Sequence, residues 1–277
     1  GLRAAAQMVS YEVALGLAIM GAIMLYGTLD LAEIVRRQGD LMWGWLPRWG
    51  IVLQPLGFLL FLVAAFAETN RTPFDLPERE AEIVAGFHTE YSAVRFANFY
   101  MAEYIHIVVA SGLVVTLFLG GWQLPWLGTD LLRQHATSLA SVLLVGLTVV
   151  AVMVILLALR WSPTLQAQFD DARRYEGRFW ATLFGFVALA AVFGLGLLLS
   201  GRTLPDWAPQ VIVALVQLKV FALKTVIVAL GFIWVRWTLP SFRYDQLMAL
   251  GWKQLMPWAL VNITLTGILA LALGVAS

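Results

Sequence analysis

The sequence predicts an all-α integral membrane protein, a polytopic bundle of about seven transmembrane helices. Of its 277 residues, 61% are hydrophobic and 13% are charged, whereas an ordinary globular domain carries about 25% charged residues. Apolar runs of about twenty residues match the ~30 Å hydrocarbon core of a bilayer. The ten-residue alternation of a membrane β-barrel is absent, so the spans are expected to be helices.

The predicted spans also indicate an orientation in the membrane. They are residues 11–31, 51–67, 97–120, 139–159, 181–200, 211–235 and 258–274. With this count, the amino terminus and the loops at 68–96, 160–180 and 236–255 share one face, which carries 11 Lys and Arg residues against five on the other. The positive-inside rule therefore places the first face in the cytoplasm.

Composition excludes several classes of function. A formal net charge of +1 argues against nucleic-acid binding, which calls for a large basic patch. The chain has no cysteine, so disulfides, thiolate catalysis, iron–sulfur clusters and Cys-type zinc sites are excluded within it. His88, His106 and His135 fall in a loop, a span and the opposite loop, so no metal or haem site is predicted. Any redox centre belongs to a partner.

The loop after the second predicted span is acidic and also rich in aromatic and aliphatic residues. Residues 68–103 hold seven of the 17 acidic residues against three arginines. Asp75, followed by Pro77 and Glu78, is typical of a helix start, and on that helix Glu78 and Glu82 share a face. Charge and periodicity alone fit both a cytoplasmic helix with a solvated acidic side and a functional site.

The same loop resembles a known family. The stretch AETNRTPFDLPEREAEIVAGFHTEYSAVRFANFYMAEY at residues 67–104 is similar to the signature of the H subunit of bacterial NADH–quinone oxidoreductase, the counterpart of mitochondrial complex I subunit 1. Three further blocks agree in order: Ser10–Glu12, LGGW at Leu119–Trp122, and Arg236 with SFRYDQLMALGWK at Ser241–Lys253. The resemblance implies a membrane subunit that forms part of the quinone chamber and couples quinone reduction to proton translocation.

Two departures from the family pattern shape the domain assignment. The family's opening helices and arginine-rich loop have no counterpart before Gly1, so we expect part of the chamber wall to be missing from this chain. Residues 123–209 contain two spans where typical members have a short loop, and we interpret them as a two-helix insertion. The whole chain, residues 1–277, is then a single transmembrane domain with cytoplasmic loops at 68–96 and 236–255.

Lysines inside a span need a reason, because a charge at mid-bilayer costs about 2.5–3.5 kcal/mol on insertion scales. Lys224 lies 12 residues before Arg236 and therefore roughly 18 Å from the cytoplasmic end of its span. An ion pair that only fixes helix packing and a functional role both fit this position. The pair Lys224 and Thr225 resembles a family position, which favours a functional Lys224 and leaves Lys219 structural.

The resemblance assigns two sets of site residues. The proton or coupling path combines acids with counter-charges, namely Glu12, Glu68, Asp75, Glu78, Glu80, Glu82, Glu90, Glu103, Lys224, Arg236, Arg243 and Asp245. The quinone-chamber residues are Arg71, Phe74, Phe87 and His88. Quinone is then a substrate, while FMN and iron–sulfur clusters reside in partner subunits.

The implied partners are the hydrophilic redox arm, the other membrane-arm subunits, quinone and lipid, with no nucleic acid. The expected location is the bacterial cytoplasmic (inner) membrane. Three alternatives stay open at this point: the equivalent subunit of a membrane-bound hydrogenase or another ion-pumping oxidoreductase, a secondary transporter, and a purely structural scaffold. A transporter is typically built from inverted repeats and broken helices, which the sequence does not display.

Overall fold

The structure, a computed structural model, describes residues 2–75, 89, 91, 93–168, 172–200, 205 and 207–272. Helices dominate this part of the chain, and its only strands form a small hairpin of β1 (Leu41–Met42) and β2 (Leu46–Pro47). Two compact units are formed, one from residues 1–128 with 217–277 and the other from residues 129–216. The prediction of an all-α membrane bundle is confirmed.

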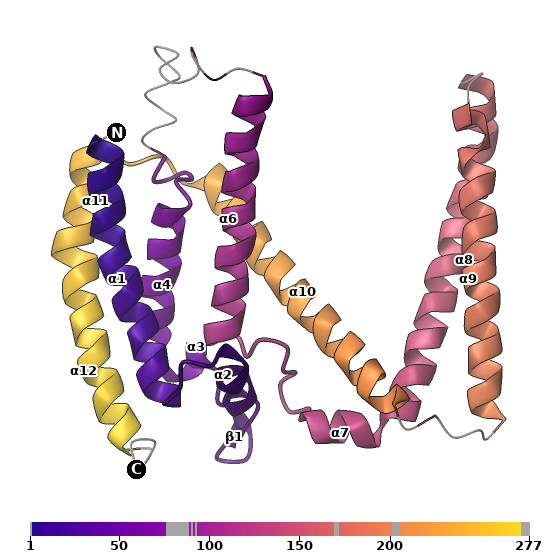
Figure 1. Cartoon of the computed structure of the whole chain (residues 1–277), viewed down its shortest axis with the longest axis horizontal. Coiled ribbons are helices and arrows are strands. Elements are labelled where there is room, and N and C mark those ends of the chain that lie inside the picture. The colour runs from indigo at the N-terminus through magenta and orange to yellow at the C-terminus, as the bar shows by residue number, and fades with distance from the viewer. Residues whose placement is uncertain are drawn as a thin grey trace. The chain divides into compact units, whose positions relative to one another are not determined.

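The first unit is a bundle built around α1. Figure 1 shows α1 (Leu2–Tyr26) with α12 (Met256–Ala272) on one side and α4 (Pro55–Glu68) on the other. The unit also contains α2 (Leu31–Gln38), α3 (Gly50–Leu53), α6 (Val94–Phe118), α11 (Tyr244–Leu250), a π-helical turn (Gly251–Leu255) and the part of α10 (Ala208–Thr238) that follows residue 216. Segments from both ends of the chain therefore pack together.

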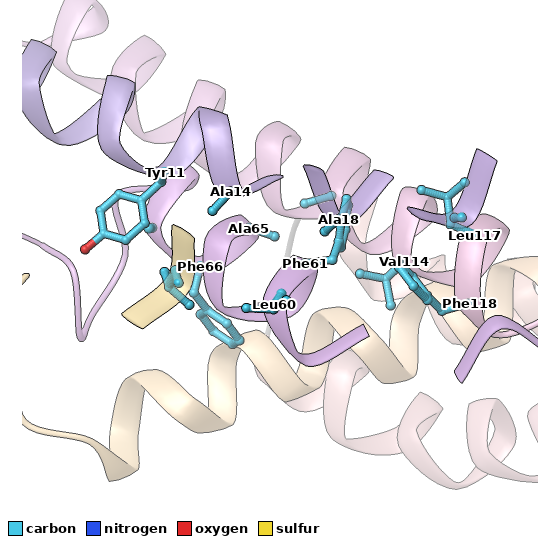
Figure 2. Packing of buried hydrophobic residues seen from close by; sticks show 14 of the residues in the cluster. Tyr11, Ala14, Ala18, Leu60, Phe61, Ala65, Phe66, Val114, Leu117 and Phe118 are labelled. Carbon is cyan, nitrogen blue, oxygen red and sulfur yellow. The ribbon is translucent and has the colours of Figure 1, made fainter. Parts of the chain in front are cut away.

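Small side chains let the helices of the first unit approach closely. Ala14, Ala18 and Ala22 recur every four residues on α1 and are all buried. Figure 2 shows this face of α1 near Phe61 and Ala65 of α4. Membrane helices associate through such packing because lipid gives no hydrophobic drive to bring them together. The core of the first unit lies where α1, α4 and α6 meet.

The second unit is an antiparallel helical hairpin. It comprises α7 (Thr129–Gln134), α8 (Ala136–Gln168), a 3₁₀ turn (Ala172–Tyr175), α9 (Glu176–Leu199) and the start of α10. A Cβ on Gly177 would lie 2.8 Å from the Ala158 carbonyl oxygen, so glycine permits the close approach of α9 to α8. The other faces of α8 and α9 expose large apolar side chains, which suits a lipid environment.

The second predicted span differs from the structure. Six helical segments in the described residues are long and apolar enough to cross a membrane: 8–26, 94–118, 136–164, 176–199, 208–238 and 244–272. The predicted span at 51–67 is instead divided into α3 and the 14-residue α4, separated by Gln54 at φ −136° and ψ 60°. Pro55 explains the break, because proline has no N–H and disfavours helical backbone in the preceding residue. The expectation of unbroken helices was wrong here.

Hydrogen bonds connect this break to α12. The Gln54 Nε2 group donates a hydrogen bond to Thr266 Oγ1, and the Thr266 hydroxyl donates to the Asn262 carbonyl oxygen over 2.7 Å. All three residues are buried. A Cβ on Gly57 would lie 3.1 Å from both the Gln54 and the Asn262 amide groups, so glycine makes room for them. The break in the α3–α4 segment is thus fixed to the last helix.

Candidate functional site

The acidic loop leaves α4 through a tight turn that is bonded to a second loop. Asn70 adopts φ 49°, and the Phe74 N–H donates to the Arg71 carbonyl oxygen over 2.8 Å. The Phe242 N–H then donates to the Pro73 carbonyl oxygen over 2.9 Å. This bond joins the first turn of the acidic loop to the segment that precedes α11, so the two loops that resemble the family are in direct contact.

Arg71 is the charged centre of this region. Its side chain is only 3% exposed, and its Nη2 atom lies 3.1 Å from the Oε2 atom of Glu103 on α6. The guanidinium carbon also lies 4.7 Å from the ring centre of Tyr104 and 5.8 Å from that of Tyr100. Residues 100, 103 and 104 fall on one face of α6, because helical neighbours are three or four positions apart. An ion pair therefore ties the acidic loop to a membrane helix.

Phe74 anchors the loop in a group of aromatic rings. Its ring centre lies 5.6 Å from that of Tyr11 on α1 and 5.7 Å from that of Phe242. The Tyr11 hydroxyl donates to the Leu247 carbonyl oxygen over 2.9 Å, which holds α1 against α11. Phe74 is buried within the chain itself, so the base of the loop has a fixed position relative to α1 and α11.

The remaining predicted residues are spread over this end of the first unit. Glu68 ends α4 and is half-buried, Asp75 is buried beside the turn, and Glu12 is exposed on α1. Arg236 is half-buried near the end of α10, whereas Arg243 and Asp245 are exposed and lie 3.5 Å apart as an ion pair. Several predicted residues lie outside the described part of the chain, namely Glu78, Glu80, Glu82, Phe87, His88 and Glu90.

Lys224 lies at the other end of α6. Its Nζ atom donates to the carbonyl oxygens of Leu119, Gly121 and Gln123 over 2.8, 3.0 and 2.7 Å. Leu119 follows Glu103 by 16 residues along α6, which corresponds to about 24 Å. In the described part of the chain, the hydrogen-bond partners of Lys224 are thus backbone carbonyls rather than the acids for which we expected a counter-charge.

Sequence reasoning overlooked several partners of these charges. Tyr100 and Tyr104 flank Arg71, and the signal for them was their helical spacing from Glu103. Trp49 lies with its ring centre 4.5 Å from the Lys224 Nζ atom, and no local pattern connects these two residues. The glycines of the LGGW block were noticed only as a resemblance, although paired glycines already suggest an unusual backbone turn.

Comparison with known proteins decides the family. The sequence profile of the family described as NADH dehydrogenase matches residues 1–172 and 172–267. The chain belongs to this family. It is 40% identical over 275 residues to the NADH-quinone oxidoreductase H subunit of Bdellovibrio bacteriovorus, an alignment that covers 96% of the chain and 55% of that relative.

Two further relatives give the same result. An NADH-quinone oxidoreductase H subunit of Solibacter usitatus, the one numbered 1, is 40% identical over 271 residues, with 97% of the chain and 60% of the relative covered. NADH-quinone oxidoreductase subunit 8 of Rhodothermus marinus is 36% identical over 277 residues, with 100% and 58% covered. This NADH dehydrogenase family member thus spans less than two thirds of the length of these relatives. The family resemblance predicted from residues 67–104 is confirmed.

The described residues at this end of the first unit offer charged and polar groups. Among the described residues, no group of three or more His, Cys, Asp or Glu side chains could hold a metal ion. The charged and polar groups include a buried guanidinium, a carboxylate paired with it and the further acids Glu68 and Asp75. In a low-dielectric setting, a new charge placed near such an ion pair would strongly change the interaction energy between its two members.

Proposed function

We propose that this chain is the H subunit of a bacterial proton-translocating NADH–quinone oxidoreductase. In this proposal it forms part of the quinone chamber and couples quinone reduction to proton translocation, while NADH, FMN and the iron–sulfur clusters are bound by partner subunits. The chain lies in the bacterial inner membrane with its loops at 68–96 and 236–255 in the cytoplasm. The names of the relatives and the six apolar helices support this proposal.

The observation that carries the coupling role is the Arg71–Glu103 ion pair. A quinone is a flat, weakly polar ring with a long isoprenoid tail, so it needs an apolar tunnel with a few polar groups at its end. Arg71 and Phe74 begin the acidic loop, which runs on to Phe87 and His88. We assign these four residues to the chamber, and we assign Glu103 to the boundary between the chamber and the membrane helices.

The pair suggests how a charge change would be passed on. Reduction of a quinone to a quinol takes two electrons, which the partner's iron–sulfur clusters supply, and two protons. Negative charge on the reduced ring would attract Arg71 and weaken the ion pair between Arg71 and Glu103. Glu103 would then take up a proton, because a carboxylate that loses its counter-charge is disfavoured in a low-dielectric site. The other acids of residues 68–103, with Glu12 and Asp245, continue the path, and Arg236 and Arg243 are its counter-charges.

The test is a Glu103→Gln variant in the complete complex, reconstituted in proteoliposomes. We expect the number of protons moved per quinone reduced to fall several-fold, because glutamine cannot take up a proton at this position. The measurement pairs NADH oxidation with a pH-sensitive dye. Glu33→Gln is the matched control, since Glu33 binds Arg36 and Arg37 on α2, away from the acidic loop. Unchanged coupling in Glu103→Gln would reject the assignment.

Co-purification separates this proposal from its alternatives. An NADH-binding flavoprotein among the partners supports the NADH–quinone oxidoreductase, whereas a hydrogenase subunit would support the related complex. Flux of a solute through liposomes that hold this chain alone would instead indicate a transporter. We assign residues 123–209, the two-helix insertion, to contact with lipid or with a neighbouring membrane subunit.

A further inference from the structure

We propose that the end of α6 forms a binding site for one ammonium-type monovalent cation, which the Lys224 side chain fills. The site, called here the carbonyl site, consists of the backbone carbonyl oxygens of Leu119, Gly121 and Gln123 together with the ring of Trp49. It lies about 24 Å along α6 from Glu103. The proposal is independent of the proposed quinone chemistry.

The contacts match an ammonium group in number and kind. A protonated lysine carries three N–H donors and no acceptor, and the carbonyl site offers three oxygens between 2.7 and 3.0 Å from Nζ. The Trp49 ring centre lies 4.5 Å from Nζ, within the range of a cation–π interaction, and tryptophan is the strongest aromatic partner for a cation. A neutral amine would turn its lone pair toward one of the oxygens, so these contacts suit an ammonium group better than an amine.

The carbonyl oxygens converge because α6 ends at Phe118 in a glycine turn. The Leu119 carbonyl lies at the C-cap of α6, and those of Gly121 and Gln123 follow it in the turn, where the negative end of the helix dipole favours a cation. Gly120 and Gly121 adopt φ 74° and 51°. A Cβ on Gly120 would lie 2.5 Å from the Trp49 Nε1 atom, so this turn requires glycine for both its conformation and its space.

A buried glutamine holds the turn in place. The Gly120 N–H donates to Gln38 Oε1 over 2.9 Å, and Gln38 Nε2 donates to the Thr116 carbonyl oxygen over 2.8 Å. Gln38 is fully buried on α2. Since these bonds do not involve Lys224, the carbonyl site is expected to persist when the lysine is shortened. A preformed site can then accept a free cation.

Two consequences follow for Lys224. Its three hydrogen bonds hold α10 against the end of α6, and its loss should therefore lower the stability of the complex. Its neighbour Lys219 provides the contrast, because it lies on the same helix, is exposed and has no bond to the carbonyl site. Lys219 and Lys224 are therefore a matched pair for an experiment on one helix.

The experiment is cation rescue of a Lys224→Ala variant in the detergent-purified complex. We expect Lys224→Ala to lower the Tm of the complex by about 5 °C, and added methylammonium chloride to restore it in a concentration-dependent manner. Sodium chloride and tetramethylammonium chloride are the salt controls, because neither supplies N–H donors. Lys224→Met should lower the Tm as well but resist rescue, since its side chain occupies the path to the site.

Lys219→Ala is the control for position on α10, and it should leave the Tm unchanged with or without methylammonium. The proposal is overturned if methylammonium stabilises Lys219→Ala as much as Lys224→Ala, or if Lys224→Met matches the unmodified chain. Should Lys224→Ala not assemble, Trp49→Leu and Trp49→Phe test the cation–π contact of the site with the lysine in place. Trp49→Leu should then lower the Tm more than Trp49→Phe, and equal losses would reject the role of the ring. A negative result leaves the quinone proposal intact, because no outcome depends on activity.

Discussion

The two units of the chain differ in what they bury. The first unit (residues 1–128 and 217–277) encloses Arg71, Gln38, Gln54 and Asn262, whereas Ser162 is the one buried polar side chain among the described residues of the second unit (129–216). Because unsatisfied polar atoms are costly in a membrane, each buried one in the first unit needs a specific partner. The first unit therefore depends on particular residues, whereas the hairpin of α8 and α9 needs only apolar helices that fit together.

The largest expected effect concerns buried charge. Arg71→Met should destabilise the first unit by about 3–5 kcal/mol, because it removes the counter-charge of a partly buried carboxylate, that of Glu103. The matched change in the second unit is Arg133→Met, which removes a pair with Asp130 at 3.9 Å in which both side chains are exposed. Such surface pairs contribute about 0–1 kcal/mol. Thermal unfolding of the complex measures the loss of stability in each variant. Equal losses for Arg71→Met and Arg133→Met would contradict the contrast between the units.

A smaller effect is expected for glycine. A Cβ on Gly50 would overlap the Leu117 carbonyl oxygen, so Gly50→Ala should cost about 1–3 kcal/mol through overpacking. A Cβ on Gly185 would meet nothing within 4 Å, and Gly185→Ala on α9 should be neutral or stabilising by up to about 1 kcal/mol. The difference in Tm between the two variants tests how tightly each unit is packed. Similar stability of both would show that the first unit can relax around an added methyl group.

The smallest expected effect concerns hydroxyl groups. Thr266→Val removes the partner of Gln54 and should cost about 0.6–1.7 kcal/mol, the range of single hydrogen bonds between membrane helices. Thr148→Val on α8 removes only a bond to the Leu144 carbonyl oxygen of its own helix, and we expect almost no change. Denaturation in mild detergent with a calorimetric readout can resolve the pair. A larger loss of stability for Thr148→Val than for Thr266→Val would contradict this prediction.

The sequence predicted the features that depend on composition and on contiguous motifs. Long apolar runs sufficed for the all-α membrane class, and residues 67–104 sufficed for the family. The break at Gln54 was hidden because the rest of the run from Ile51 to Ala67 is apolar, and Gln54 and Pro55 were its only local signals.

The partners of the charges were harder to predict, because they are contacts between segments far apart in the chain. Glu103 was expected to act with the loop acids, and its spacing on α6 gave no sign that Arg71 would pair with it. Lys224 was expected to face carboxylates, and its oxygen partners belong to backbone, which carries no sequence signal. Backbone acceptors can be recognised from sequence only indirectly, through the glycines that shape them.

The π-helical turn at Gly251–Leu255 changes the rotation of α12 about its own axis. A π turn accommodates one residue more than an α turn, which changes the direction of all later side chains by about 100° relative to an unbroken α-helix. Gly251, at the start of the turn, packs against Ser10, while Asn262 and Thr266 further along face the break at Gln54. The number of residues between these two anchors, more than their chemical character, determines which side of α12 meets the bundle.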